Sequence, residues 1–332
     1  MIYVLAFLAS GAIVVVAGTA LARHADAIAE ATGLGRLWIG SVLLAGATSL
    51  PELTTDVAAV RLGATDLAVG DLFGSSMANM LILAIIDLLH PRQQVLQRAT
   101  LDHALTATLA ISLNALAAIL VIARPEFTVA GVGPGSVLLF LACVAGIRLV
   151  YRHALRDGPG APASAHHDSP RAVPSLRRAA LGFLAAAVAV LVAAPAFAWS
   201  AKGLAEITGL GQTFVGTWLL GLATSLPELV ASWAAVRMGA FDMAVGNLFG
   251  SNAFNMAIFL ALDLAQPGSL FAALDPSHAL SGFFAVVLMS LGLAAIVYRA
   301  EKRFAMIEPG SLLIVVAYIA GVLLLYAHTA AS

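Results

Sequence analysis

Long apolar runs recur along the 332-residue chain and are separated by short polar stretches. Each run holds about 20 residues, which is enough for a helix to cross a hydrocarbon core of about 30 Å. This pattern predicts a chain that passes through a membrane many times. We predict ten membrane-spanning helices, at residues 2–22, 37–60, 67–89, 101–123, 129–151, 178–200, 213–236, 243–265, 278–298 and 309–328.

The composition agrees with this pattern. With 61% hydrophobic and 11% charged residues, the chain is far too apolar for an ordinary soluble domain. We interpret the first run as a retained helix, because no charge precedes it and Arg23 follows it, the reverse of a signal peptide. The only cysteine, Cys143, lies in an apolar run, so the sequence offers no disulfide framework. The predicted fold class is an all-α polytopic membrane protein.

The distribution of basic residues predicts the orientation. If the amino terminus lies outside the cytoplasm, 14 of the 17 basic residues fall on the cytoplasmic side. Only Arg61, Arg124 and Lys202 fall on the other side. Such an excess of Lys and Arg is typical of cytoplasmic loops. We therefore expect an inner (plasma) membrane protein with both termini outside the cytoplasm.

One stretch of the chain occurs twice, at a constant offset of 176 residues. The copies cover residues 47–83 and 223–259, and 24 of their 37 aligned positions are identical. Five predicted spans belong to each half. Because five is an odd number, the second half enters the membrane upside down relative to the first, as in many secondary transporters. The sequence therefore predicts two inverted-topology repeats.

A composition break separates the two repeats. The segment between them is rich in Gly, Pro, Ala and Ser and has no apolar periodicity, which is typical of a flexible linker. Its histidines, His153, His166 and His167, need no function in a basic linker. The predicted divisions are 1–151 (first five-helix repeat, motif 45–83), 152–176 (cytoplasmic linker) and 177–332 (second five-helix repeat, motif 221–259).

A proline interrupts the second predicted span of each half. Pro51 and Pro227 cannot donate a backbone hydrogen bond to the carbonyls of Ala47 and Ala223, one turn earlier. In hydrocarbon, a freed carbonyl must find another partner or line a cavity in the protein. A simple kink would explain one such proline, but both are followed at once by a glutamate.

These glutamates are the strongest chemical signal in the sequence. Glu52 and Glu228 lie near the middle of their spans, where an acidic side chain costs several kcal/mol on insertion scales. A buried glutamate that bonds a neighbouring helix is the structural alternative, and a matched pair makes it less attractive. Thr48 and Thr224 lie four residues before the glutamates and share their helix face. Ser49 and Ser225, three residues before, flank the same face.

The second part of each repeat adds further oxygen atoms. Ser75 and Asn79, like Ser251 and Asn255, are four residues apart on one helix face. Such groups also occur as ordinary contacts between membrane helices, so their value comes from lying beside the glutamates. Four glycines leave room for close helix approach, namely Gly70, Gly74, Gly246 and Gly250.

Oxygen-only ligands select hard cations such as Ca²⁺ or Na⁺. Neither motif contains His or Cys, which argues against zinc and copper. Two ionised glutamates would balance one Ca²⁺ or two Na⁺ ions. In an exchanger, Ca²⁺ and Na⁺ occupy the same site in turn. The empty site carries two negative charges and is too costly to reorient across the membrane.

The residues also carry a resemblance. The Thr-Ser-Leu-Pro-Glu and Gly-(Asn/Asp)-x-x-Gly-Ser-x-x-x-Asn pairs resemble the two α-repeats of the Ca²⁺/cation antiporter superfamily, on its sodium/calcium exchanger branch. The resemblance spans essentially the whole chain. It implies central ligands at Glu52, Asn79, Glu228 and Asn255. It also implies flanking Na⁺ sites, with carbonyls near Ala45 and Gly221 and hydroxyls at Thr48, Ser49, Ser75, Thr224, Ser225 and Ser251.

By the same resemblance, Na⁺ enters in exchange for Ca²⁺, and two gating helices slide to switch access. Ca²⁺ and Na⁺ would be transported substrates within the lipid bilayer. We expect no cofactor, no nucleic acid and no obligate protein partner.

Several positions depart from the family's pattern. Asn255 stands where many prokaryotic members carry aspartate, and Asp71 stands where asparagine is usual. Asp56 is opposite Ser232 in the other repeat. Asp56 would be either a site carboxylate or a solvated or hydrogen-bonded residue near a helix end. Asp87 and Asp263 form a matched pair that we interpret as helix-end anchors.

The sequence leaves three alternatives to Ca²⁺/Na⁺ exchange. Protons or another cation could be the counter-ion if Asp56 or Asp71 titrates in the pathway. An intramembrane enzyme such as a protease is disfavoured, because no histidine or lysine base lies in the motifs, so we expect no enzyme activity. A channel would need a continuous pore, whereas the duplication favours alternating access.

Overall fold

The computed structural model describes residues 2–90, 95–156, 175–207, 220–298 and 309–331, and nearly all of them are helical. The first half contains α1 (Ile2–Thr32), α2 (Arg36–Trp38), the π-helix η1 (Ile39–Leu44), α3 (Ala45–Thr48), α4 (Leu50–Arg61), α5 (Thr65–Leu89), α6 (Val95–Arg98), α7 (His103–Ala123) and α8 (Pro134–Arg156). The second half contains α9 (Leu176–Ile207), α11 (Leu220–Thr224), α12 (Leu226–Arg237), α13 (Phe241–Ala265), α14 (Leu270–Ala273), α15 (His278–Tyr298) and α16 (Pro309–Ala331).

Eight helices in the described part of the chain are long and apolar enough to cross a membrane: α1, α5, α7, α8, α9, α13, α15 and α16. The all-α polytopic fold class is therefore confirmed. The second and seventh predicted spans are not among the eight, because both are broken into short helices. Part of the seventh, residues 213–219, lies outside the described residues. The described part of the chain thus contains eight continuous spans, and the predicted count of ten is not confirmed.

The break in the second span falls at Ser49, between α3 and α4, and its counterpart falls at Ser225, between α11 and α12. Both serines leave helical geometry, with φ −86° and ψ 1° at Ser49 and φ −77° and ψ 5° at Ser225. The prolines sit in the first turn of the helix that follows. A proline in the first turn loses no hydrogen bond, because the N–H there has no helical partner. The interruption is therefore a break between two helices, sharper than a kink.

The two halves of the chain interlock. α5 of the first half packs against α15 and α16, and α13 of the second half packs against α7 and α8. In the same way, α1 packs on α12 and α9 packs on α4. Each contact has its mirror partner at the matched positions, as a two-fold relation between the halves requires.

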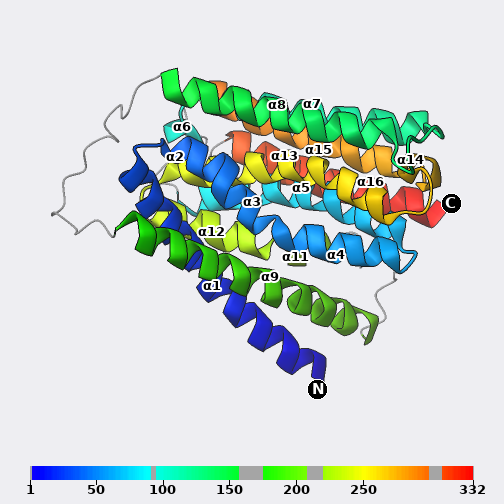
Figure 1. Ribbon diagram of the computed structural model, residues 1–332, viewed down its shortest axis with the longest axis horizontal. Helices are drawn as coiled ribbons and strands as arrows, with labels where there is room; N and C mark the ends of the chain where they lie inside the picture. The colour runs from blue at the N-terminus through cyan, green and yellow to red at the C-terminus, as the bar shows by residue number, and fades with distance from the viewer. Residues whose placement is uncertain (1, 91–94, 157–174, 208–219, 299–308, 332) are drawn as a thin grey trace.

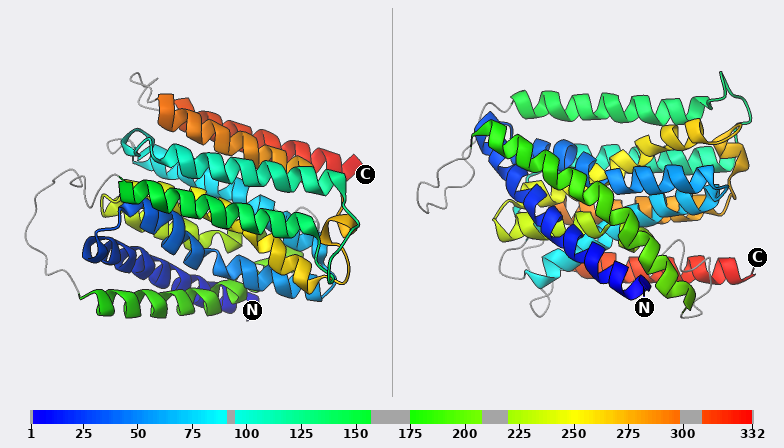
Figure 2. Two further views of the ribbon diagram at one scale, coloured as in Figure 1. Left: turned by 45° about the horizontal axis from the view of Figure 1, so that its top comes forward. Right: turned by 60° about the horizontal axis from the view of Figure 1, so that its bottom comes forward.

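α1 and α9 lie side by side along one flank of the bundle, where they run obliquely across the other helices (Figures 1 and 2). Two aromatic contacts join them near one end: the rings of Phe7 and Phe197 stack at 4.5 Å, and Tyr3 and Trp199 lie 4.9 Å apart. α1 extends to Thr32, ten residues beyond the predicted span, and α9 extends to Ile207. These two long helices therefore form a pair that covers the broken helices.

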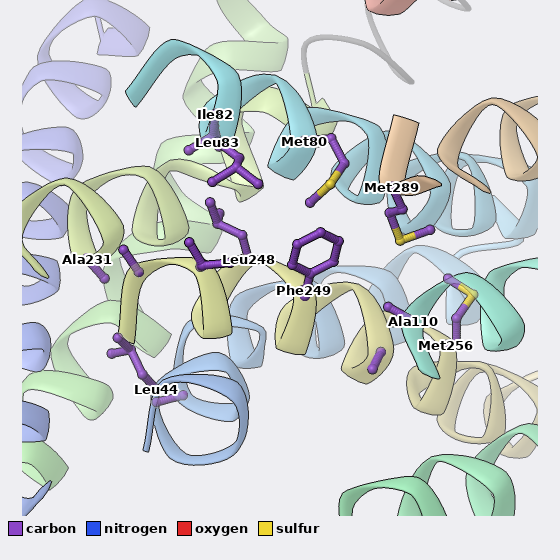
Figure 3. Packing of buried hydrophobic residues seen from close by; sticks show 14 of the residues in the cluster. Leu44, Met80, Ile82, Leu83, Ala110, Ala231, Leu248, Phe249, Met256 and Met289 are labelled. Carbon is purple, nitrogen blue, oxygen red and sulfur yellow. The ribbon is translucent and has the colours of Figure 1, made fainter. Parts of the chain in front are cut away.

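The apolar core lies around α5 and α13. Figure 3 shows Phe249 of α13 facing Met80 of α5 and Met289 of α15. All three side chains are fully buried. Gly292 of α15 gives them room, since a Cβ there would lie 3.3 Å from the Phe249 ring. α5 and α13 thus pack on each other and on α15 through fully buried side chains.

Asp87 and Asp263 end α5 and α13 with matched hydrogen bonds. Asp87 accepts from the Leu96 backbone N–H at 3.2 Å and from the Ser311 hydroxyl at 2.8 Å. Asp263 accepts from the Leu270 backbone N–H at 3.0 Å and from the Ser136 hydroxyl. Each carboxylate thus ties its helix end to the fifth span of the other half. The predicted anchoring role of both aspartates is confirmed.

A second matched pair was not predicted from the sequence. At the start of α13, Asp242 lies 3.0 Å from His103 Nε2, and at the start of α5, Asp66 lies 3.1 Å from His278 Nε2. Each pair joins the third span of one half to the fourth span of the other. The sequence signal was present, because both aspartates and both histidines recur at nearly the same offset.

The predicted linker begins inside a helix. Residues 152–156 continue α8 to Arg156, where His153 lies 3.2 Å from Asp102. Residues 157–174, with His166 and His167, lie outside the described residues. α8 therefore continues about one helical turn past the predicted start of the linker, through polar residues that follow the apolar run.

Candidate cation site

Small residues bring the two repeats together at the broken helices. A Cβ on Gly250 of α13 would lie 2.3 Å from the carbonyl oxygen of Ser41, and one on Gly246 would lie 2.9 Å from that of Leu37. On the matched side, a Cβ on Gly221 would lie 3.1 Å from the backbone of Gly74. No larger side chain fits at Gly250 without moving the backbone. The predicted close approach at Gly246 and Gly250 is confirmed.

The first group of polar residues at this crossing is the Glu52 cluster, made of Glu52, Asp71, Ser75, Thr224 and Ser225. Ser75 Oγ lies 3.4 Å from Glu52 Oε1, 2.9 Å from Ser225 Oγ and 3.3 Å from Thr224 Oγ1. The Thr224 hydroxyl donates to Asp71 Oδ1 at 3.1 Å. All five side chains are buried. The Glu52 carboxylate therefore contacts the Ser75 hydroxyl of its own repeat, which in turn contacts two hydroxyls of the other repeat.

The second group is the Glu228 cluster, made of Glu228, Thr48, Asn247 and Ser251. Ser251 Oγ lies 3.3 Å from Glu228 Oε1 and 3.4 Å from Thr48 Oγ1. The Thr48 hydroxyl donates to Asn247 Oδ1 at 3.2 Å. All four side chains are buried. The serine–glutamate and serine–threonine contacts, and the bond from each threonine to the other repeat, recur in both clusters with the halves exchanged, whereas the Ser75–Ser225 contact has no counterpart among the described residues.

The two predicted carbonyl ligands lie at the helix breaks. The carbonyls of Ala45 and Gly221 accept from the backbone N–H groups of Ser49 and Ser225, at 3.0 and 3.2 Å. Each also accepts from the threonine hydroxyl one residue before the break, at 3.3 and 3.2 Å. They therefore face the same hydroxyls that form the clusters.

Each of the four predicted central ligands keeps a buried oxygen without a hydrogen-bond partner among the described residues: Glu52 Oε2, Glu228 Oε2, Asn79 Oδ1 and Asn255 Oδ1. They come from two pairs of matched positions. Unpartnered buried oxygens also occur at Ser49, Thr55, Asp56, Asp71, Thr100, Thr106 and Asn114. Buried polar atoms almost always have a partner, so unpaired ones need an explanation such as an ion. Their oxygen chemistry fits a hard cation.

The serines at the helix breaks differ from one another. Ser225 Oγ lies 2.9 Å from Ser75 Oγ, whereas Ser49 Oγ is buried and has no partner within the described chain. The structure thus places Ser225 in the Glu52 cluster and leaves Ser49 with its oxygen unused.

Asp56 and Asp71 lie against each other one turn away from Glu52. Their carboxyl groups are within hydrogen-bond reach, and both are fully buried. Among the described residues no other group donates to Asp56. A hydrogen bond between two carboxyls needs a proton on one of them. At the matched positions, Asn247 Nδ2 donates to Ser232 Oγ at 3.0 Å without any such proton. A solvated Asp56 at a helix end is therefore wrong, because the side chain is 0% exposed.

Within the part of the chain that the structure describes, no basic side chain balances these acids. The ion pairs found there join Arg36 to Asp26 and Glu30, and histidines to Asp66, Asp102 and Asp242. None reaches Glu52 or Glu228. Over the same residues, no three His, Cys, Asp or Glu side chains are placed to hold one metal ion. Any cation held here would therefore have neutral oxygens beside the glutamates as ligands.

One polar residue of the region was missed by the sequence reasoning. Asn252 of α13 is fully buried, and its side chain bonds both Asn79 and the backbone of Ser76. It stands at the position matched by Ser76, so the difference between the two repeats was the available signal.

Comparison with known proteins identifies the family. A family model described as "Sodium/calcium exchanger protein" matches residues 2–148 and 178–327. Inner membrane protein YrbG of Escherichia coli (strain K12) is 29% identical over 303 residues, which cover 88% of this chain and 87% of that protein. Sodium/calcium exchanger MaX1 of Methanosarcina acetivorans is 34% identical over 110 residues, 33% of this chain and 30% of that protein.

The fold is also shared with a solved structure. The sodium-calcium exchanger NCX_Mj, soaked with 2.5 mM Na⁺ and 1 mM Sr²⁺, superposes with a TM-score of 0.70. The superposition covers 97% of this chain and 98% of that one at 20% identity, so this likeness concerns the fold. Together with the family match over both halves, it shows that the chain belongs to the sodium/calcium exchanger protein family, whose members are multi-pass membrane cation antiporters.

Proposed function

We propose that this protein exchanges Ca²⁺ for Na⁺ across the membrane by alternating access at one site, formed by the Glu52 and Glu228 clusters with Asn79 and Asn255. The observation that carries the proposal is that all four predicted central ligands, at two pairs of matched positions, keep a buried oxygen without a partner among the described residues. Ca²⁺ and Na⁺ both take oxygen ligands of these kinds.

The charge of the site supports antiport. Two buried carboxylates without a basic partner in the described chain are costly in a membrane, and a bound cation removes most of that cost. A charged, empty site would be expensive to move between the two sides. One Ca²⁺ and two Na⁺ ions carry the same charge, so either load offsets the two glutamates equally, while the Asp56–Asp71 pair beside them is unchanged.

The packing supports α1 and α9 as the moving pair. They pack mainly on each other and on the broken helices, and α5 and α13 are anchored at their ends by Asp87 and Asp263. Gly18 of α1 lies against α12 one turn from the break, where a Cβ would be 3.1 Å from Val230. A slide of α1 and α9 would therefore change the surroundings of both glutamates.

A vesicle assay tests the proposal. Purified protein is placed in Na⁺-loaded liposomes, and ⁴⁵Ca²⁺ uptake is measured after dilution into Na⁺-free buffer. We expect uptake that stops when the Na⁺ gradient is collapsed and persists when a proton ionophore alone is added. The matched control is Glu52→Gln, which should not transport. An uptake rate that is the same with and without the Na⁺ gradient would contradict Na⁺ coupling.

A second candidate is exchange of Ca²⁺ or another cation for H⁺. The observation that favours it is the Asp56–Asp71 contact, which can hold a proton beside Glu52. The second repeat supplies the matched variant, Asp56→Ser with Asp71→Asn, which copies Ser232 and Asn247. If H⁺ is the counter-ion, this double variant loses uptake driven by a pH gradient. If Na⁺ is the counter-ion, Na⁺-driven uptake continues in it.

We further propose an inner (plasma) membrane location with both termini outside the cytoplasm. The excess of basic residues in the expected cytoplasmic loops supports this orientation. A single cysteine introduced in the 152–176 linker should react with a membrane-impermeant maleimide only in inside-out vesicles. Labelling in intact, right-side-out vesicles would reverse the orientation.

A further inference from the structure

Asn79 is the one central ligand whose amide is held by another side chain within the described residues. Its Nδ2 donates to Asn252 Oδ1 at 2.8 Å, and its Oδ1 is buried without a partner there. Both asparagines are nearly or fully buried, so water does not replace these contacts. The amide of Asn79 can therefore offer either its oxygen or its nitrogen to the proposed cation site, depending on how Asn252 holds it.

A backbone carbonyl decides it. Asn252 Nδ2 donates to the carbonyl oxygen of Ser76 at 3.2 Å, and a carbonyl can only accept. Turning the Asn252 amide over would place two oxygens against each other there. Asn252 must therefore direct its Oδ1 toward Asn79, and Asn79 must donate its Nδ2–H to that oxygen. Its own Oδ1 is then left on the opposite side of the amide.

The other repeat has no such device. The position matched to Asn252 is Ser76, whose hydroxyl turns back to the Leu72 carbonyl of its own helix at 2.9 Å. Within the described residues, Asn255 has a partner for neither Nδ2 nor Oδ1. Of the two amides at matched positions, the amide of Asn79 is therefore fixed and the amide of Asn255 is free to turn.

From this arrangement we propose that Asn252 is a positioning residue for cation binding: it fixes the Asn79 amide so that Asn79 offers oxygen, and not an N–H, to the transported cation. This inference rests on the proposed function and adds a residue to it. It also assigns the two repeats unequal roles, since Asn79 is preset as a ligand and Asn255 must be turned by the cation itself. Residues that only orient a ligand change metal affinity by roughly 10–100-fold when they are lost.

Asn252→Ser tests the inference, because it copies the first repeat and removes both side-chain contacts. We expect the apparent affinity for ⁴⁵Ca²⁺, measured by equilibrium binding to the purified protein, to fall by about 10-fold or more. The matched control is Asn114→Ser. Asn114 is equally buried and donates to the Asn252 backbone carbonyl at 3.3 Å, but it does not touch the Asn79 amide. We expect it to keep the unmodified affinity.

A second background separates orientation from packing. With Asn79→Asp, both ends of the side chain are oxygen, so no orientation remains to be fixed. One of these oxygens would face Asn252 Oδ1, and Asn252→Ser would relieve that repulsion. Asn252→Ser should therefore weaken Ca²⁺ binding in the unmodified background, and should leave it unchanged or tighter in the Asn79→Asp background. A merely structural role would weaken binding in both backgrounds.

The outcomes are distinct. Unmodified affinity in Asn252→Ser, equal losses in Asn252→Ser and Asn114→Ser, or the same loss in the Asn79→Asp background would each overturn the inference. If Asn252→Ser does not fold, as judged by thermal unfolding without ions, Asn252→Leu keeps the side-chain shape and is measured in its place. Loss of binding in Glu52→Gln with unmodified binding in Asn252→Ser overturns only the role of Asn252. If the unmodified protein binds neither Ca²⁺ nor Na⁺, the proposed function fails as well.

Discussion

The Glu52 and Glu228 clusters share most of their contacts but differ in charge. Each has a serine 3.3–3.4 Å from its glutamate and a threonine that reaches across to the other repeat. The threonine of the Glu52 cluster donates its hydroxyl to a carboxylate, that of Asp71. The threonine of the Glu228 cluster donates to an amide oxygen, that of Asn247. Duplication therefore preserved the geometry of the site, and a few substitutions made its two sides chemically unequal.

The largest effect should come from removing either glutamate. We expect Glu52→Gln and Glu228→Gln to lower Ca²⁺ uptake by more than about 100-fold, beyond the range seen for residues that only support a ligand. Because Asp71 remains in the Glu52 cluster, any residual uptake should appear in Glu52→Gln. Initial rates in Na⁺-loaded vesicles measure both variants. If residual uptake appeared in Glu228→Gln and not in Glu52→Gln, the carboxylate of Asp71 would not be what compensates for the lost glutamate.

The next largest effect should come from filling the close approach of the two repeats. Gly250→Ala places a Cβ 2.3 Å from the Ser41 carbonyl oxygen, so the helices must separate. Overpacking of this kind costs typically about 1–3 kcal/mol, and backbone cannot move aside as a side chain can. Thermal unfolding in detergent should show the loss. Gly35→Ala is the control, because a Cβ there meets nothing within 4 Å.

Equalising the repeats should raise stability. Asp56→Ser with Asp71→Asn replaces two buried carboxyls by the Ser–Asn contact already present at Ser232 and Asn247. Replacing buried charges by well-packed neutral groups is often stabilising by about 1–4 kcal/mol. We expect a higher unfolding temperature than that of the unmodified protein. An unchanged or lower temperature would mean that the two aspartates are better satisfied than their contacts indicate.

The smallest effect separates the two serines at the helix breaks. Ser225→Ala removes a hydroxyl 2.9 Å from Ser75, which should cost about 1 kcal/mol of unfolding free energy. Ser49→Ala removes an oxygen that has no partner in the described chain, so stability should stay the same or rise. Chemical unfolding of the two variants under identical conditions measures the difference. Equal losses would show that Ser49 has a partner of its own.

Much of the site was predictable because its residues are polar in an apolar setting. Glu52, Glu228 and the hydroxyls around them stand out against runs of Ala, Leu and Val, and the repeat doubles the signal. The anchoring of Asp87 and Asp263 followed from their place at helix ends. The broken second and seventh spans were less predictable, because hydropathy does not show whether a proline bends a helix or starts a new one.

Asn252 and the His–Asp pairs could not be assigned from the sequence. Amides and histidines also occur as ordinary contacts between membrane helices, so their type carries little information. Their roles depend on which neighbour faces them. That neighbour lies in the other half of the chain, about 140 to 210 residues away in each case.

The sequence by itself determined that the chain is a membrane protein, that it is duplicated and that its repeats contain oxygen-bearing side chains in an apolar setting. These properties depend on composition and spacing, which are local. Only the tertiary structure decided that hydroxyls of both repeats meet in each cluster, that Asp56 lies against Asp71, and that Asn252 bonds the Asn79 amide. Two nearly identical repeats contain the same groups, so the sequence cannot say which copy contacts which. The close packing of α13 on η1 at Gly246 and Gly250, and of α11 on α5 at Gly221 and Gly74, makes that choice.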